Sequence, residues 1–206
     1  MSSKRAGKFM FLIISALVLV IFLPRPGLAQ EKKMPRQELR LTPARQFQLF
    51  QKMLAFERSW KGKGISEITI AVLYEKNFEL SLWTKEDFAA AVSPEATVEG
   101  LPVRLVELAV EEKAAWVDVL SQQKINFLYL TPLRPATLRS QIKDILSLCR
   151  QFKVATFTGE VSYVDLGVAI GLGVENDTPH IFVNLRAARE QGLDLSARLL
   201  RMTSIR

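Results

Sequence analysis

The sequence is poor in cysteine and histidine, with only Cys149 and His180 among its 206 residues. A disulfide needs two cysteines and a structural zinc site needs four Cys or His ligands, so a single chain can form neither. A serine or cysteine nucleophile would have to use His180 as its base, and no nucleophile motif accompanies it. A metal site built from oxygen ligands alone remains open. We expect no catalytic residues, no metal and no cofactor.

The part of the chain that should fold also lacks a large excess of positive charge. Lys and Arg number 28 against 21 Asp and Glu, a net charge of +7. Residues 1–29 hold four basic residues and no acid, which leaves 24 basic against 21 acidic residues in the rest. These are mostly interleaved, without the aromatic and basic pattern of a stacking surface. We therefore expect no nucleic-acid binding.

Apolar runs long enough to cross a membrane are absent. The longest, residues 9–23, falls short of the roughly twenty residues that a span requires. It follows a basic stretch, and Gly27 and Ala29 then provide the small side chains that signal peptidase needs. We predict a signal peptide over residues 1–29, cleaved after Ala29, and a periplasmic mature protein. The alternative is an uncleaved signal anchor.

Helical and strand patterns alternate along the rest of the chain. Residues 30–43 are polar and predict a flexible lead-in, and residues 44–206 predict a single α/β domain. Strands joined by single helices need right-handed crossovers, which make a mainly parallel sheet with helices on both faces. The chain should end in an antiparallel hairpin and a C-terminal helix from about Ser196. The expected helices are 44–60, 77–92, 110–122 and 135–152, and the expected strands are 68–73, 102–108, 125–130, 154–158, 168–174 and 180–185.

One connection lies where a ligand could bind. The segment from Thr158 to Gly167 follows the carboxyl end of a predicted parallel strand, the edge at which open α/β sheets bind ligands. We predict a small-molecule pocket there. The alternative is a plain connection into the hairpin. The candidate ligand-binding residues are Thr158, Glu160, Ser162 and Asp165.

Other motifs have ordinary structural explanations. Gly171-Leu172-Gly173 lacks the third glycine and the helix of a dinucleotide loop, so it predicts a glycine-containing strand or bulge. Asn176-Asp177-Thr178 has glycosylation spacing but suits a hairpin turn. Glu111-Glu112 fits a helix start. His180 is expected to be structural or exposed, and Cys149 a buried apolar filler.

The C-terminal stretch carries four short motifs in order: Ile181-Phe182-Val183-Asn184, Ala187-Ala188, residues 192–196 and Leu199-Leu200. In this order they resemble the YfiR family of periplasmic proteins. In that family a strand ends in Asn, here Ile181-Phe182-Val183-Asn184, and an Ala-bearing turn follows, here Ala187-Ala188. A Gly-Leu-x-Leu-Ser stretch comes next at residues 192–196, before a Leu-Leu helix at Leu199-Leu200. The likeness spans most of the chain after residue 44 and is strongest after about residue 154.

The resemblance implies an exported, non-catalytic α/β protein that acts by binding. The best-known members restrain an inner-membrane diguanylate cyclase through its periplasmic region, lower cyclic-di-GMP output and tend to dimerise. Two features of this sequence differ from the family. Trp60-Lys61 stands where Trp-Pro is common, and Cys149 stands alone where well-studied members have cysteine pairs. Redox control is therefore not expected.

We predict a periplasmic repressor that binds an inner-membrane signalling enzyme, either a diguanylate cyclase or a sensor kinase, and that forms a homodimer. The alternative function is a periplasmic small-ligand receptor with its pocket at the carboxyl edge of the sheet. Arginine is favoured at interfaces, and four arginines alternate with inward-facing leucines near the C-terminus. They could equally form a solvated helix face. The candidate partner-binding residues are Arg186, Arg189, Arg198 and Arg201.

Overall fold

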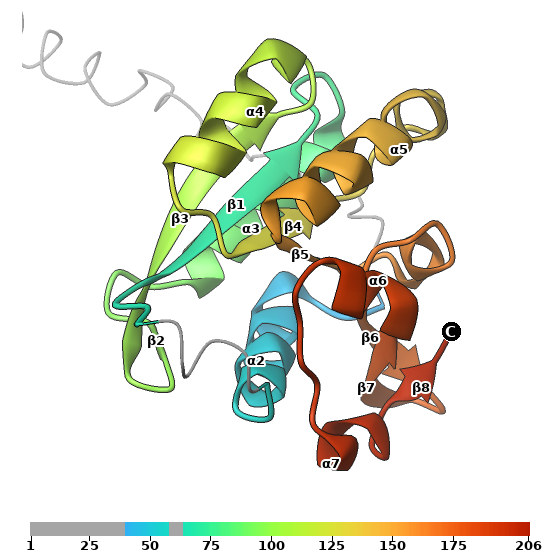
Figure 1. The fold of residues 1–206 in the computed structure, drawn as a ribbon. Coiled ribbons are helices and arrows are strands. Elements are labelled where there is room, and N and C mark those ends of the chain that lie inside the picture. Colours follow the sequence, from blue (N-terminus) through green and yellow to red (C-terminus); the bar gives the residue numbers. More distant parts are fainter. Residues whose placement is uncertain (1–39, 58–63) are drawn as a thin grey trace, which may run out of the picture. The chain divides into compact units, whose positions relative to one another are not determined.

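A computed structural model describes residues 40–57 and 64–206 of the chain (Figure 1). The predicted signal peptide, most of the lead-in and Trp60-Lys61 lie outside the described residues. The described helices are α2 (Pro43–Leu54), α3 (Glu79–Ala91), α4 (Lys113–Gln122), α5 (Pro135–Phe152), the 3-10 helix η1 (Val161–Val164), α6 (Leu185–Glu190) and α7 (Ala197–Leu200). The strands are β1 (Ile68–Tyr74), β2 (Thr97–Val98), β3 (Leu101–Ala109), β4 (Phe127–Leu130), β5 (Ala155–Thr158), β6 (Ile170–Glu175), β7 (Thr178–Val183) and β8 (Ser204–Ile205).

The strands form one sheet in the order β2-β3-β1-β4-β5-β6-β7-β8. Pairing is parallel from β3 through β6 and between β7 and β8, and antiparallel between β2 and β3 and between β6 and β7. Strand β1 lies inside the sheet and is buried from Ile68 to Leu73, as its continuous apolar run predicts for a strand covered on both faces. The mainly parallel α/β architecture with a late antiparallel hairpin is confirmed.

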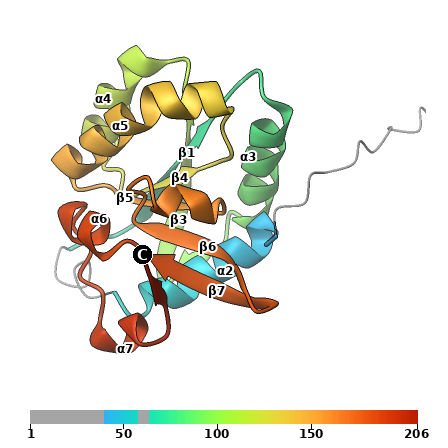
Figure 2. The same cartoon turned by 90° about the vertical axis from the view of Figure 1, so that its right-hand side faces the viewer.

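Two apolar cores lie on opposite faces of the sheet. One is formed with α2 and α3, and the other with α4 and α5 (Figures 1 and 2). Successive residues of a strand point to opposite faces, so Ile70 and Val72 of β1 enter the first core and Ala71 and Leu73 the second. The sheet therefore lies between two layers of helices, which leaves the amino and carboxyl ends of the strands at the two ends of the sheet.

Helix α2 carries a buried glutamine that ties it to the sheet. The Gln46 Oε1 atom accepts a hydrogen bond from the Tyr129 hydroxyl at 2.7 Å, and Nε2 donates to the Leu41 carbonyl at 2.7 Å. Gly159, just after β5, lies against the same side chain. A Cβ atom there would sit 2.3 Å from Gln46 Nε2, so the close approach requires glycine.

The glycines of β6 are explained by the packing of η1 on this strand. A Cβ atom on Gly171 would lie 2.7 Å from Val164 Cγ2, and one on Gly173 would lie 2.4 Å from Val161 Cγ2. Both glycines belong to a regular strand that pairs with β7. The predicted glycine-containing strand is confirmed, and its glycines admit the valines of η1.

The last elements differ in part from the prediction. The hairpin turn is confirmed, with Asn176 and Asp177 at φ values of 48° and 59°, as a tight two-residue turn requires. The C-terminal helix expected from about Ser196 is confirmed as the short α7, while α6 before it and β8 after it were not predicted. The Ser196 hydroxyl accepts the Leu199 N–H and starts α7. The first helix ends at Leu54, earlier than predicted.

Candidate functional site

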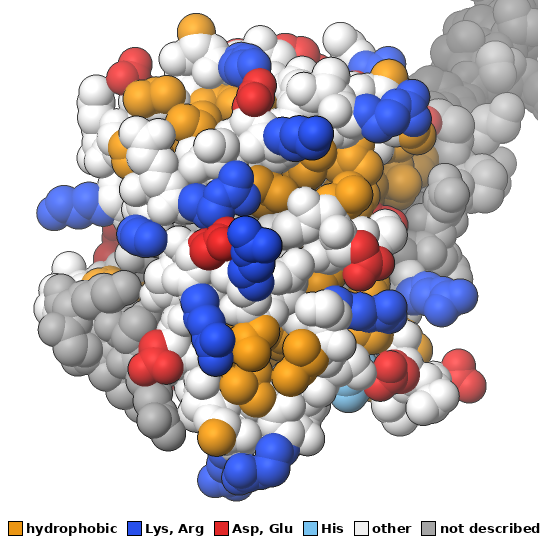
Figure 3. All heavy atoms as spheres, turned by 45° about the vertical axis from the view of Figure 1, so that its right-hand side comes forward, with side chains coloured by type: hydrophobic (Ala, Val, Ile, Leu, Met, Phe, Trp, Pro, Cys, Tyr) orange, Lys and Arg blue, Asp and Glu red, His pale blue; other side chains and the backbone are white. Residues whose placement is uncertain are grey.

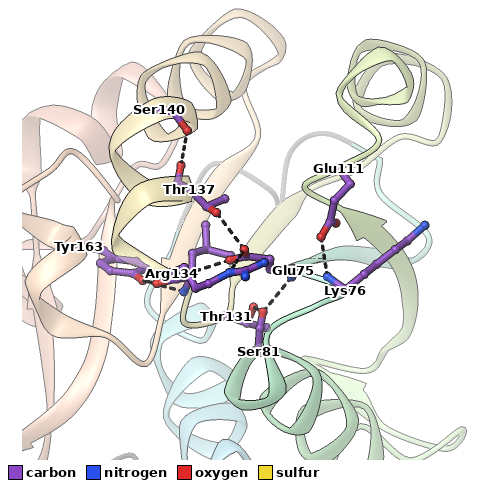
Figure 4. Close-up of polar contacts among 10 residues, drawn as sticks. Glu75, Lys76, Ser81, Glu111, Thr131, Arg134, Thr137, Ser140 and Tyr163 are labelled. Atoms are coloured by element: carbon purple, nitrogen blue, oxygen red, sulfur yellow. Dashed lines mark hydrogen bonds and ion pairs between the residues drawn. The ribbon is translucent and has the colours of Figure 1, made fainter.

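The carboxyl edge of the sheet contains the point where strand order reverses. From β1 the chain crosses to β3 on one side, and it then returns to β4 on the other side of β1. Open α/β sheets bind ligands in the crevice at such a point. Here it is formed by Glu75, which follows β1, and Thr131, which follows β4 (Figure 4).

The Glu75 carboxylate occupies this position itself. Its side chain is 3% exposed, its Oε2 accepts the Arg134 N–H at 2.9 Å, and its Oε1 accepts the Thr137 hydroxyl at 2.9 Å and the Arg134 Nε (Figure 4). Burial raises the pKa of Glu75, but the hydrogen bonds from Arg134 and Thr137 outweigh it and hold the pKa below its usual value.

This arrangement places a negative charge at the N-terminus of α5. Arg134 is the N-cap residue of that helix, where unpaired N–H groups and the helix dipole attract anions. In nucleotide-binding proteins with an open α/β sheet, a ligand phosphate takes such a place. Here Glu75 fills it from within the chain, so the crevice at the strand reversal is closed to an anionic ligand.

The neighbouring hydroxyl groups are committed to backbone contacts. Thr131 Oγ1 donates to the Leu73 carbonyl at 2.9 Å, so in the 2.6 Å contact with Ser81 Oγ the serine is the donor. Ser81 Oγ also accepts the Glu75 N–H at 2.9 Å. The Tyr163 hydroxyl accepts the Leu133 N–H (Figure 4). No base adjoins Ser81 in these contacts, and the group holds the strand ends in place rather than activating a nucleophile.

A pocket of about 380 Å³ opens farther along the same edge, where the chain leaves β5. Glu160 and Ser162 line it, as the sequence predicts, and burial raises the pKa of Glu160. Arg40, before α2, and Arg206, after β8, also reach the pocket. Phe182 of β7 contributes to its wall. The pocket thus combines two guanidinium groups, a carboxyl group and an aromatic ring.

The other two predicted ligand residues lie elsewhere. Thr158 is buried beneath the pocket, and its hydroxyl donates to the Leu130 carbonyl and accepts the Glu160 N–H, at 2.9 and 3.0 Å. It therefore shapes the turn. Asp165 is exposed at the end of η1 and does not line the pocket. Sequence reasoning missed Arg40 and Arg206, because no local pattern links the two ends of the described chain.

The four candidate partner-binding arginines are exposed but belong to two helices. Arg186 and Arg189 lie on α6, and Arg186 pairs with Glu190 at 2.8 Å while its side chain remains 89% exposed. Arg198 lies on α7, with its guanidinium 5.4 Å from the centre of the Phe56 ring, and Arg201 ends that helix. The predicted set is therefore divided into an α6 pair and an α7 pair.

The α7 pair adjoins exposed apolar side chains. Met202 follows Arg201 and is 60% exposed, and Ile205 of the edge strand β8 is 56% exposed. Arg206 follows, with its guanidinium over the Phe182 ring. Figure 3 shows apolar side chains framed by Lys and Arg on the face that includes these C-terminal elements.

The comparison with protein families shows the family to which the chain belongs. A family profile described as YfiR/HmsC-like matches residues 68–204, more than half of the chain. The chain belongs to the YfiR/HmsC-like family. This membership fits a periplasmic regulator of cyclic-di-GMP signalling and a regulatory rather than a catalytic role. No curated protein sequence matches the chain.

Solved structures share the fold of this YfiR/HmsC-like chain. An ABC domain in complex with L-Trp from Streptococcus pneumonia is 17% identical with a TM-score of 0.56, and a conserved domain protein from Vibrio cholerae is 15% identical with a TM-score of 0.56. CD0873, a substrate binding protein with adhesive properties from Clostridium difficile, is 14% identical with a TM-score of 0.55. They cover 80%, 80% and 81% of this chain, which spans 60% of each. The likeness concerns the fold alone.

The single thiol of this family member is buried in the core. Cys149 of α5 is fully buried, and burial raises the pKa of its thiol to about 12. A thiol with such a pKa is a poor nucleophile at neutral pH. This agrees with the predicted role as an apolar filler.

His180 has a structural position in the hairpin. Its Nε2 lies 3.0 Å from Ser204 Oγ and 3.3 Å from Glu175 Oε2, which links β6, β7 and β8. Across residues 40–57 and 64–206, no three His, Cys, Asp or Glu side chains gather as a metal site would require. In the same part of the chain, no helix has the length and apolar character needed to span a bilayer.

Proposed function

We propose that the chain is a periplasmic repressor that binds the outer-facing region of an inner-membrane signalling enzyme, a diguanylate cyclase or a sensor kinase. The observation that carries this proposal is the family match over residues 68–204. Export through a signal peptide cleaved after Ala29 and assembly into a homodimer belong to the same proposal. The chemistry takes place in the partner, since the hydroxyl groups beside Glu75 are engaged with the backbone.

The proposed docking surface is centred on α7. Arg198 and Arg201 form no ion pair within the described part of the chain, so their charges are available to acidic groups of a partner. Met202 and Ile205 add exposed apolar area beside them. Interfaces combine such apolar area with arginine, whose planar guanidinium bonds carboxylates in pairs. Arg186 and Arg189 extend the surface along α6.

Charge reversal at α7 tests the surface. We expect Arg198→Glu combined with Arg201→Glu to weaken capture of the partner's periplasmic region by roughly tenfold or more, which corresponds to about 1.4 kcal/mol. In the host, the same variant should raise cyclic-di-GMP or kinase output. The matched control is Arg45→Glu with Lys52→Glu on α2, where both side chains are exposed. Unchanged affinity in a folded α7 variant would exclude this surface.

Periplasmic crosslinking of the tagged chain tests the function itself. Capture of a membrane protein with a cytoplasmic cyclase or kinase domain would support the proposal. Capture of the chain alone, as its dimer, would contradict it and favour the second candidate.

The second candidate is a small-ligand receptor, and the pocket beside Glu160 favours it. The pocket holds about 380 Å³ and brings Arg40 and Arg206 together with the carboxyl group of Glu160. Pockets of this size with a few converging polar groups are typical of small-molecule sites. A ligand at one hundred times its dissociation constant should stabilise the fold by about 2.7 kcal/mol. Thermal shifts across periplasmic metabolites measure this, and no shift across a broad library would count against a receptor.

A further inference from the structure

A row of basic side chains follows one side of α5. Arg139, Lys143 and Arg150 lie within about 40° of one another around the helix axis, because each residue advances 100°. Arg139 and Lys143 are exposed and form no ion pair within residues 40–57 and 64–206. The acid beside them, Asp144, is bonded to Lys113 of α4 at 2.5 Å. The charge of this row is therefore not neutralised by α5 itself.

Helix α6 extends the row of basic side chains, because its Glu190 contacts a basic side chain of each helix. Glu190 Oε1 accepts Arg186 Nε at 2.8 Å, and Glu190 Oε2 lies 4.0 Å from Arg150 Nε. Lys153 Nζ donates to the Glu190 carbonyl at 2.9 Å. These contacts place α6 directly beside the end of α5. We call the combined surface the α5–α6 cationic face; it consists of Arg139, Lys143, Arg150, Lys153, Arg186 and Arg189.

An exposed leucine lies between the two helices. Leu166 is 48% exposed. The next residue, Gly167, lies against α5, since a Cβ atom there would be 3.2 Å from Leu146 Cδ1. The Gly167 carbonyl also accepts Gln191 Nε2 at the end of α6. The α5–α6 cationic face therefore has an exposed apolar residue in the connection that packs beside it.

We propose that the α5–α6 cationic face binds the anionic headgroups of a phospholipid bilayer, with Leu166 entering the headgroup layer. Cations around an apolar side chain are the combination by which peripheral proteins bind anionic lipid surfaces. This face shares Arg186 and Arg189 with the docking surface, but it does not include Arg198 and Arg201 of α7. It would hold the repressor at the membrane in which its partner resides.

The spread of the charges favours a surface over a single anion. Arg139 and Arg150 are eleven residues apart, about 16 Å along α5. A single phosphate would need donors that converge within hydrogen-bond distance of one point. A bilayer instead presents many negative charges over a plane, which suits cations distributed along two exposed helices.

Vesicle binding of the full chain, in the form its host processes, tests the proposal. We expect cosedimentation with vesicles that contain phosphatidylglycerol, and little with phosphatidylcholine alone. Each lost cation should lower the partition coefficient roughly fivefold, so Arg139→Gln with Lys143→Gln should lower it roughly twenty-five-fold. Raising the salt from about 0.05 M to about 0.5 M should release the protein, because the Debye length shortens several-fold. Leu166→Ser should weaken binding and leave the salt dependence unchanged.

The control and the contrary outcomes keep this proposal separate from the proposed function. Arg45→Gln with Lys52→Gln removes two exposed charges on α2 and should bind vesicles as the native chain does. Equal binding to neutral and anionic vesicles would overturn the proposal, and so would unchanged binding by the Arg139 and Lys143 variant. If the variant with Arg139→Gln and Lys143→Gln instead failed to bind the partner's periplasmic region, the face would bind an acidic protein. The membrane proposal would then be wrong. The α7 variant, even if it no longer binds the partner, should still bind vesicles as the native chain does.

Discussion

Glu75 and Arg134 are 59 positions apart, and the Glu75 carboxylate accepts the Arg134 backbone N–H at 2.9 Å. This contact joins the end of β1 to the start of α5 across the point where strand order reverses. Arg134 Nε bonds the same carboxylate, and Thr137 completes the arrangement. At the position where this architecture usually binds a ligand, this chain thus has a structural contact between β1 and α5.

Loss of the Glu75 charge should destabilise the fold. Glutamine keeps the size of the side chain but has a single acceptor oxygen, and its NH₂ group would face the donors of Arg134 or Thr137. Hydrogen bonds to charged groups contribute about 1.5–3 kcal/mol, so we expect Glu75→Gln to lower the free energy of unfolding by about 2 kcal/mol. Urea unfolding measures this. The control is Glu95→Gln at an exposed position, which should change little.

The stability of the native chain and that of Glu75→Gln should respond differently to acid. The pKa of Glu75 is lowered in the folded chain, while an unfolded glutamate titrates near about 4.3. Its contribution is therefore complete above that pH and is lost as the pH falls through the folded pKa. The stability difference between the native chain and Glu75→Gln should be constant near neutrality and should narrow below about pH 4. A difference that widens in acid would contradict the assignment.

Substitution of Glu160 should change the free energy of unfolding in the opposite direction from substitution of Glu75. Burial raises its pKa, so the charged form is disfavoured in the folded chain and stability falls as the pH rises above the unfolded value. We expect Glu160→Gln to be neutral or to raise the free energy of unfolding by about a few tenths of a kcal/mol at neutral pH, since the group is partly solvated. A loss as large as that of Glu75→Gln would show that Glu160 is structural rather than a pocket group.

The contact between β6 and η1 should tolerate no side chain at Gly173. An added Cβ atom would lie 2.4 Å from Val161 Cγ2, well inside contact distance. We expect Gly173→Ala to cost about 1–3 kcal/mol, the usual range for overpacking. A second change, Val161→Ala, removes the clashing methyl groups and should recover part of the loss in the double variant. Additive losses in the two single variants would indicate that the two residues do not compete for space.

Cys149 should be unreactive in the folded protein. Its thiol is fully buried and its pKa is raised to about 12, so almost no thiolate forms at pH 8. We expect a thiol reagent to label the chain only after denaturant is added, and a reductant to leave the thermal midpoint unchanged. Rapid labelling of the native protein would mean that α5 opens readily. The labelling rate against denaturant concentration gives the measurement.

The order of helices and strands could be predicted because it depends on local periodicity. The buried run of β1 and the apolar stripe of α5 each reflect contacts that repeat along a single element. The hairpin turn depends on two adjacent residues, Asn176 and Asp177. The resemblance in the C-terminal stretch likewise identified the family.

The candidate site depended on contacts that no local pattern encodes. Arg40 and Arg206 meet at one pocket through the paths of α2 and β8, and Gln46 bonds Tyr129 across 83 positions. The short α7 and β8 are stabilised by tertiary packing rather than by propensity, which explains why the short length of the C-terminal helix and the presence of β8 could not be predicted. Asp165 was placed in the pocket because the turn of η1 could not be seen in the sequence.

Helix α2 lies before the segment that defines the family. It contributes Phe47, Phe50, Met53 and Leu54, each no more than 4% exposed, and the Phe50 and Phe157 ring centres are 4.3 Å apart. A fragment cut to residues 68–204 would leave this aromatic face of the sheet open to water. The unit that folds is therefore longer than the sequence signature by which it is recognised, and α2 must be part of any fragment meant to remain in solution.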